Sequence, residues 1–471
     1  MLVVLSGFLF EGVFMNNDFV NGKILPTLIK FALPVLFALF LQAMYGGVDL
    51  LVIGQFSDNS NVSAVSTGSQ LMQSITTAIS GLSMGTTVLL AQKIGKGKRK
   101  EAGEIIGSAV ILFTVISILL TILFVIFSKY ICRIMNAPAE AFDETVKYFT
   151  ICSVGLVFIV AYNVIGSIFR GIGDSRTPLI TVAIACAVNI IGDLTFVAGF
   201  QMGASGTALA TVLAQAVSVI VSLMIIRHQK LPFDVKKSDF NVKSEQNHFY
   251  IKYTLKLGVP IALQDFLVSI SFLVILSIVN NLGLVYSAGI GVAEKVCMFI
   301  MLVPIAFMQS LSSFVGQNEG AGHHERSLRA MFYGMAVSFG LGLIMALITF
   351  FHGDILAGIF SNENDTIMQA AEYLKAYAID TLLVSFLFCF SGYYNGCGKT
   401  TFVMIQGLVG AFGVRIPVSW LMSKINPVSM FRIGLASPCS TIVQIILCFI
   451  VLFIMIRKEK IRRNKSEKIT I

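Results

Sequence analysis

The feature that most constrains this chain of 471 residues is a weak internal repeat with a fixed spacing. Six landmarks recur in the same order 225 residues later, and Pro34 recurs as Pro260 after 226 residues. A chain with such a repeat consists of two halves that share one order of structural elements. The recurring pairs are Gln92 and Gln317, Gly95 and Gly320, Gly97 and Gly322, Tyr148 and Tyr373, Gly171 and Gly396, and Gly173 and Gly398.

The composition of the chain indicates a lipid environment. Hydrophobic residues make up 56% of the sequence, charged residues only 13%, and the mean hydropathy is +0.84. A water-soluble protein of this length could not bury so much apolar surface, so the bilayer must solvate it. Duplicated halves in such a chain are typical of membrane transporters built from two structural repeats.

Twelve apolar runs predict an all-α integral membrane protein, with twelve transmembrane helices in two pseudo-symmetric six-helix bundles. The predicted domains are an N-terminal segment (1–29), a first bundle (30–226), a linker (227–253), a second bundle (254–456) and a basic tail (457–471). The predicted spans are 30–55, 64–91, 104–128, 145–169, 178–200, 204–226, 254–280, 287–314, 329–351, 371–394, 401–422 and 433–456.

Basic residues set the expected orientation. Of the 34 lysines and arginines, 26 lie on one side of the predicted spans and 6 on the other, while Lys295 and Arg415 fall within spans. The positive-inside rule therefore places both termini and the linker in the cytoplasm. The first residues lack the basic region and cleavage site of a signal peptide, and we expect the true start at Met15. The eight cysteines form no CxxC pair, so neither a zinc site nor a disulfide framework is expected.

Three stretches carry a resemblance to a known family. Arg170–Pro178 (RGIGDSRTP) closely resembles the loop after the fourth span of multidrug and toxic compound extrusion (MATE) transporters. Val48–Gly54 resembles the end of that family's first span, and Gly203–Thr211 resembles the entry to its sixth. The motifs follow the family's order and spacing from about residue 20 to 456. Within the family, the chain is most similar to the DinF/MepA-type bacterial branch.

This resemblance implies two six-helix bundles around a central cavity that opens alternately to either side of a bacterial cytoplasmic membrane. It implies export of bulky, amphipathic, often cationic compounds and drugs in exchange for entering H+ or Na+. It also implies a protein that is not an enzyme and has no cofactor other than the coupling ion. We expect a monomer in the bilayer that binds no nucleic acid and no metal other than Na+.

Two carboxylates lie inside predicted spans. Placing each of them in a membrane helix costs at least ~2.5–3.5 kcal/mol on insertion scales, so a functional role is expected. Asp49 lies 19 residues beyond Lys30, roughly 28 Å along a helix, and Asp193 lies 17 residues beyond Arg176, roughly 26 Å. Both helices start at the cytoplasmic side, so both carboxylates reach a similar depth in the outer half. Low-dielectric surroundings and a second carboxylate favour the neutral, protonated form.

Two further oxygen-bearing side chains fall at the same depth. Asn189 precedes Asp193 by one helical turn on the same face, and Thr211 returns to the outer half on the sixth span. The resemblance implies that Asp49, Asn189, Asp193 and Thr211 form the cation-coupling site of DinF-type members. The alternative is structural, with Asp49 capping a helix end and Asp193 bonding a neighbouring serine. At the repeat offset, Asn189 and Asp193 fall on Val414 and Val418, so the site is not duplicated.

Pro34 removes a backbone hydrogen bond inside the first span and is a candidate hinge, although a static kink is the alternative. The second half departs from NorM-type members, whose acidic positions correspond to Val268 and Val384 here, with Asp265 and Asp380 out of register. Arg415 and Lys295 are expected to pair with carboxylates. The remaining candidates for the wall of a substrate cavity are Gln42, Met44, Tyr45, Gln70, Gln264, Glu294, Met298 and Arg415.

Rival functions leave weaker traces in the sequence. Gly396–Thr400 (GCGKT) lacks the first glycine and the preceding strand of a nucleotide-binding loop, so it indicates a tight cytoplasmic turn. A flippase for lipid-linked saccharides from the same superfamily often has fourteen spans and a cationic cavity. The twelve predicted spans and the acidic pair Asp49 and Asp193 weigh against this alternative. A membrane enzyme would need a cluster of His, Asp or Cys at one face, and a channel fits two repeated bundles less well than alternating access does.

Overall fold

The computed structural model describes residues 18–229, 231, 233 and 235–469, and Met15 lies outside them. The chain divides into two compact units. Of the described residues, unit 1 contains those up to Phe266 together with Gln309–Ala330 and Asn395–Thr400; unit 2 contains Leu267–Met308, Met331–Tyr394 and those from Thr401. The division differs from the predicted domain limits, which stay a prediction.

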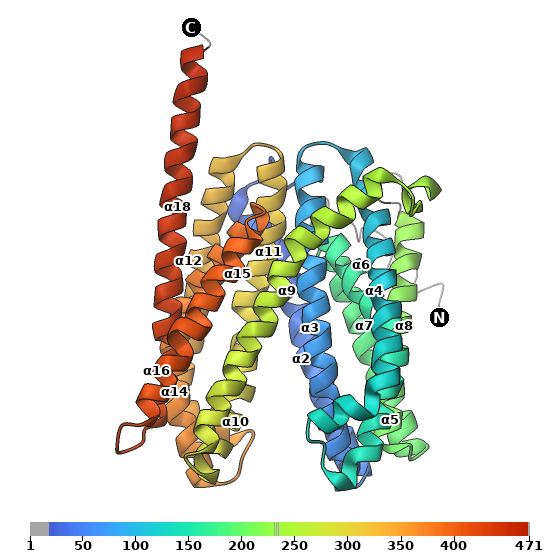
Figure 1. Cartoon of the computed structure of the whole chain (residues 1–471), viewed down its shortest axis with the longest axis vertical. Helices are drawn as coiled ribbons and strands as arrows, with labels where there is room; N and C mark the ends of the chain where they lie inside the picture. Colours follow the sequence, from blue (N-terminus) through green and yellow to red (C-terminus); the bar gives the residue numbers. More distant parts are fainter. Residues whose placement is uncertain (1–17, 230, 232, 234, 470–471) are drawn as a thin grey trace. The chain divides into compact units, whose positions relative to one another are not determined.

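Long helices make up both units, and Figure 1 shows those of residues 24–229 in unit 1 in blue to green, running side by side. In the first half they are α2 (Ile24–Phe56), α3 (Asn59–Gly95), α4 (Arg99–Ile134), α5 (Phe142–Val154), α6 (Leu156–Ile172), α7 (Arg176–Asp193) and α8 (Gly203–Gln229). In the second half they are α9 (Glu245–Asn280), α10 (Leu284–Ile300), α11 (Leu302–Gly320), α12 (His324–Phe351), α13 (Gly353–Gly358), α14 (Asn364–Gly396), α15 (Thr400–Leu408), α16 (Ile416–Ser423), α17 (Met430–Gly434) and α18 (Ala436–Ile469).

Eleven helices in the described chain are long and apolar enough to cross a membrane, and one bent pair brings the total to twelve. The bent pair replaces the predicted single span 145–169. Residues Ala139–Val154 and Leu156–Ile172 meet at 52°, with Gly155 at the joint. A Cβ on Gly155 would lie 2.3 Å from a methyl carbon of Val212, so α8 packs directly against the bend. The residue that packs against the break therefore lies 57 positions further along the chain, beyond the reach of a local pattern.

The duplicated glycines form matching turns. Gly97 and Gly322 have φ of +71° and +80°, and Gly173 and Gly398 have φ of +97° and +74°. Only glycine adopts this left-handed backbone without strain, which explains why these positions recur at the repeat spacing. The turn at Gly398 lies in the stretch GCGKT, so this stretch ends a helix as expected.

The repeated landmarks also contact one another inside unit 1. Gln92 Nε2 donates to the carbonyl oxygen of Gly396 at 2.8 Å, and Gln317 Nε2 donates to the carbonyl of Gly171 at 3.1 Å. Next to these bonds, α3 and α11 approach so closely that a Cβ on Gly95 would lie 1.9 Å from the carbonyl oxygen of Gln317. The same holds in reverse for Gly320 and the carbonyl oxygen of Gln92, at 2.1 Å. We call these reciprocal contacts the glutamine crossing.

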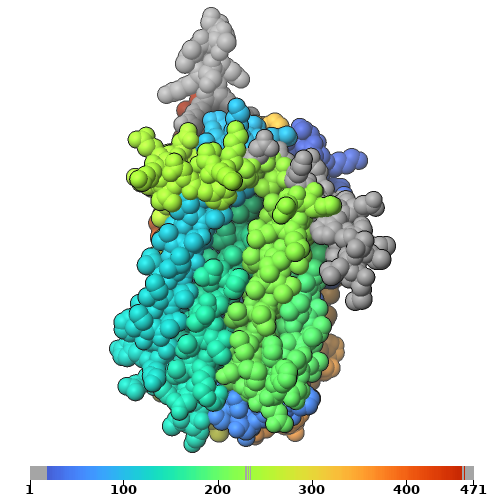
Figure 2. Space-filling model, turned by 90° about the vertical axis from the view of Figure 1, so that its right-hand side faces the viewer, coloured from blue at the N-terminus to red at the C-terminus, as the bar shows by residue number. Residues whose placement is uncertain are grey.

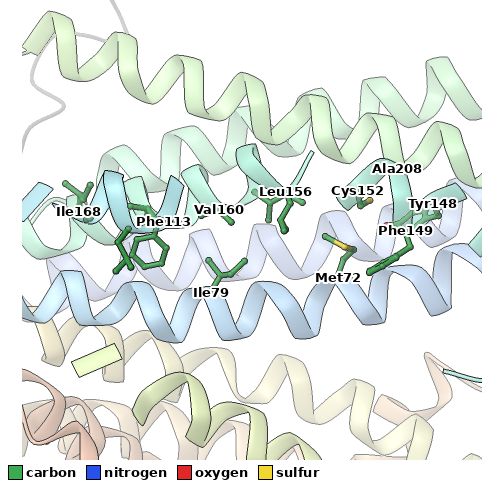
Figure 3. Packing of buried hydrophobic residues seen from close by; sticks show 14 of the residues in the cluster. Met72, Ile79, Phe113, Tyr148, Phe149, Cys152, Leu156, Val160, Ile168 and Ala208 are labelled. Atoms are coloured by element: carbon green, nitrogen blue, oxygen red, sulfur yellow. The ribbon is translucent and has the colours of Figure 1, made fainter. Parts of the chain in front are cut away.

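The apolar core of unit 1 fills the space between α3 and its neighbours. Met72 and Ile79 of α3 face Phe149, Leu156 and Val160 of α5 and α6 in Figure 3, and all five are buried. Tyr148 packs over Gly68, where a Cβ would lie 2.3 Å from its ring. Close helix approach at small residues is typical of membrane bundles, where lipid supplies no hydrophobic force between helices.

The predicted linker packs against unit 1 rather than lying free. Its short helix η3 (Lys237–Phe240) contacts α4, and Figure 2 shows this yellow-green segment across one end of the bundle. A Cβ on Gly107 would lie 2.1 Å from the carbonyl oxygen of Asp239. Asn247 is 1% exposed; it donates to the carbonyls of Asp239 and Asn241 and accepts from Ser108 Oγ.

Candidate functional site

The structure brings the four predicted cation-site residues together inside unit 1. The Asp49 carboxyl on α2 interacts with the side chains of Asp193 and Asn189 on α7 and of Thr211 on α8. Asp49 is 4% exposed, Asn189 1% and Asp193 0%, so the two carboxyl groups share a site shielded from solvent. Asp49 lies seven residues before the end of α2, which excludes the alternative that it caps the helix.

These approaches are close polar contacts rather than ideal hydrogen bonds. Among the residues that the structure describes, no partner meets hydrogen-bond geometry for Asp49 Oδ1, both Asp193 oxygens, both Asn189 amide atoms or Thr211 Oγ1. Buried polar atoms are nearly always satisfied, so such a cluster needs an explanation. A proton shared by the carboxyl groups, or a small cation held by oxygens of the four side chains, would satisfy it. The donor set therefore fits either coupling ion.

The backbone around Asp193 brings α7 and α8 close together at the site. Asp193 is the last residue of α7, and the chain continues as a π-helical segment, η2 (Leu194–Gly199). Short π segments widen one turn and are frequent at functional sites. A Cβ on Gly192 would lie 2.9 Å from the Cβ of Ala210, so α7 and α8 approach closely beside Asp193 and Thr211.

Polar residues on α2 continue from this cluster toward Pro34. Tyr45 interacts with Asp49, and its hydroxyl oxygen accepts a long hydrogen bond from Gln215 Nε2 at 3.4 Å. One turn earlier, Gln42 Nε2 donates to Tyr162 Oη at 2.6 Å. Pro34 itself lies inside the continuous helix α2, as predicted for a residue that interrupts backbone hydrogen bonding. Its role as a hinge stays a prediction.

The other predicted cavity residues are scattered. Gln42 lines a cavity of unit 1, described below, whereas Met44 and Gln70 are exposed and Gln264 is half-buried. In unit 2, Met298 is exposed and Glu294 is half-buried. Their assignment to a substrate cavity stays a prediction.

Unit 2 contains a polar cluster that the sequence did not predict. Thr441 Oγ1 donates to Asp380 Oδ1 at 2.6 Å, and the buried Arg415 interacts with the same carboxylate. The Arg415 guanidinium also stacks over Phe272, 4.5 Å from the ring centroid. Arg415 thus has a carboxylate near it, as expected. The signal that could have revealed the cluster is Thr441, a hydroxyl in an apolar span.

A comparison with protein families places the chain. The family model described as MatE matches it twice, over residues 34–195 and 260–421. The chain belongs to the MatE family. The two MatE matches begin at Pro34 and Pro260, the landmark prolines of the internal repeat.

Relatives of this MatE chain carry transport-related names. The chain is 27% identical over 407 residues to "Probable multidrug resistance protein YpnP" of Bacillus subtilis, covering 86% of this chain and 90% of the relative. It is 22% identical to "Multidrug export protein MepA" of Staphylococcus aureus, covering 86% and 89%. The solved structure "Crystal structure of MATE in complex with MaL6" covers 95% of this chain and 99% of its own, with a TM-score of 0.87 and 19% identity.

The predicted MATE membership and the all-α membrane fold are therefore confirmed. The chain is a multi-pass membrane protein of a transporter family.

Proposed function

We propose that the protein is a secondary active multidrug exporter, which expels amphipathic, often cationic compounds in exchange for entering H+ or Na+. The observation that carries the proposal is the buried pair Asp49 and Asp193, with Asn189 and Thr211 beside it. A membrane protein rarely keeps two carboxyl groups in one shielded pocket unless they serve ions or protons.

The coupling follows from electrostatics. Two negative charges in one shielded pocket repel strongly, so the pair favours one bound proton or Na+. Release of that ion on the other side restores the unfavourable charge pair and biases the bundle toward a different conformation. A ligand shifts such an equilibrium only by its difference in affinity between the two states, and the charge pair supplies that difference.

The names of the relatives support the substrate class. Proteins named for multidrug resistance and multidrug export match most of the chain over most of their own length. The excess of basic residues between the spans on one side supports a topology with both termini in the cytoplasm of a bacterial cell. The protein acts as a monomer and uses no cofactor in this proposal.

The test is transport by the purified chain in liposomes, with ethidium as the substrate. A proton gradient and a sodium gradient are imposed separately, and dye movement is followed by fluorescence. We expect export under at least one gradient, and loss of export to background in Asp49→Asn and Asp193→Asn. The matched control is Asp58→Asn, which makes the same chemical change at an exposed helix cap.

Three outcomes discriminate between the possibilities. Full transport by both Asp49→Asn and Asp193→Asn would remove the site assignment. Equal loss in Asp58→Asn would show a general effect of the substitution rather than a coupling role. Failure of the wild-type chain to move any organic cation under either gradient would favour the flippase from the same superfamily.

A further inference from the structure

A cavity in unit 1 has a chemistry opposite to that of the carboxylate pair. Its volume is about 70 Å³, or about 640 Å³ of unfilled space with its open mouth included, and residues of α2, α3, α6, α7, α8 and α11 line it. Its lining includes Arg170, Tyr162, Ser175 and Gln42, with apolar residues such as Leu39 and Phe169, and it includes no aspartate or glutamate.

Arg170 brings a positive charge to this cavity without a carboxylate partner. None of the ion pairs within the described part of the chain involves Arg170. One terminal nitrogen donates to Ser167 Oγ at 2.9 Å, whereas the buried Nε has no hydrogen-bond partner among the described residues. A shielded cation without a counter-charge is costly, so an anion in the cavity would be strongly favoured.

Asp174, the acid nearest to Arg170 in the sequence, makes its hydrogen bonds to other residues. Asp174 Oδ1 accepts from the backbone N–H of Arg176 and of Thr177, and Asp174 Oδ2 accepts from Thr177 Oγ1 at 2.5 Å. These bonds hold the first turn of α7 and turn the Asp174 carboxylate toward that helix. Among the described residues, the charge of Arg170 is therefore offset by the C-terminal end of α6, in whose last turn it lies.

Two further hydrogen-bond donors line the same cavity. Ser175 is 2% exposed, and its hydroxyl has no partner in the part of the chain that the structure describes. The Tyr162 oxygen accepts from Gln42, so its own proton is available for another acceptor. Tyr162 also lies close enough to Arg170 to interact with it electrostatically. A guanidinium, a serine hydroxyl and a phenol are suited to the oxygens of a carboxylate or phosphate.

We propose that this cavity binds the oxyanion, carboxylate or phosphate, of an amphipathic molecule, with Arg170 as its counter-charge and the apolar wall covering its body. Gln42 orients Tyr162 and is a positioning residue. The proposal concerns binding alone and holds whether or not the chain exports cations. It extends the expected ligands from cations to anions and zwitterions.

The test is equilibrium binding to the purified full chain in a neutral detergent. The two probes are 2-naphthoate and its uncharged analogue 2-naphthamide, which share one apolar body and differ in charge. We expect the wild-type chain to bind the carboxylate roughly tenfold more tightly, as is typical for a hydrogen bond to a charged group. Arg170→Gln should abolish this preference and leave 2-naphthamide binding unchanged.

Matched variants separate charge from structure. Arg170→Lys keeps the charge and should retain most of the preference, whereas Ser175→Ala should weaken 2-naphthoate alone. Arg176→Gln removes an exposed arginine six residues further along and should have no effect. If Arg170→Gln does not fold, Arg170→Lys and Ser175→Ala still decide the outcome through the same pair of probes.

Two results would overturn the proposal. One is equal affinity of the wild-type chain for the acid and the amide, and the other is an equal loss in Arg170→Gln and Arg176→Gln. A competition arm identifies the source of the anion. Displacement of 2-naphthoate by dihexanoyl phosphatidylglycerol would assign the site to a lipid headgroup phosphate, and failure to displace it would assign the site to a free carboxylate.

Discussion

The side-chain amide of Gln92 donates a hydrogen bond to the backbone carbonyl of Gly396, 2.8 Å away and 304 residues along the chain. The equivalent residue of the second half, Gln317, makes the reciprocal bond to Gly171. Each glutamine thus satisfies a carbonyl at the end of a helix from the other half of the sequence, where the helix leaves carbonyls without internal partners. Repeated residues of the two halves, among them Gln92, Gln317 and the glycines that they contact, are therefore partners in the folded chain.

The glutamine crossing predicts a large effect of a single methyl group. In Gly95→Ala, the new Cβ would collide with the backbone carbonyl of Gln317, and the two helices must separate. We expect a loss of about 1–3 kcal/mol in unfolding free energy, seen as a lower thermal midpoint of the purified chain. The control is Gly54→Ala, where the methyl group meets nothing within 4 Å. Equal midpoints for the two variants would contradict the crossing.

Pro34→Ala should separate a hinge from a static kink. The substitution restores a backbone N–H inside α2, so it should stiffen the helix and raise the thermal midpoint. If the helix bends during transport, ethidium export in liposomes should slow several-fold while ethidium affinity stays constant. The control is Pro260→Ala, at the repeat partner inside α9. Unchanged export by Pro34→Ala would assign Pro34 to static packing.

Asn247→Ala should release the linker from α4. The side chain makes three hydrogen bonds in a buried position, and its loss leaves the Asp239 carbonyl and Ser108 without that partner. We expect a cost of about 1–3 kcal/mol and faster proteolysis within residues 227–253. Asn241→Ala is the control, because the exposed Asn241 side chain accepts only from the Lys243 N–H. A linker equally resistant to protease in both variants would contradict the docking.

Asp58 predicts a pH dependence outside the spans. Hydrogen bonds from the backbone and side-chain N–H groups of Asn61 hold the pKa of Asp58 below its usual value. The ionised cap therefore stabilises the fold above the unfolded pKa of about 4, and this contribution is lost as pH falls through the folded pKa. The thermal midpoint of the wild type minus that of Asp58→Asn should be constant near neutral pH and should fall in acid. A difference that grows in acid would contradict this assignment.

The sequence by itself predicted the number of spans and the two repeated halves, which the helices and the two MatE matches confirm, whereas the membrane depth of Asp49, Asn189 and Asp193 stays a prediction. Each of these follows from local apolar length or from helical rise, which a chain expresses wherever it inserts. The repeated positive-φ turns were equally local, because glycine adopts that backbone with the least strain.

Tertiary structure alone decided which faces meet. The break at Gly155 packs against Val212, the linker packs against Gly107, and the pairing of Asp380 with Thr441 joins residues 61 positions apart. The setting of Arg170 is of the same kind, since the sequence shows the charge but not that the cavity lining among the described residues contains no acid. The physical reason is that contact energies fall off within a few ångströms, so they depend on helix packing that no local period encodes.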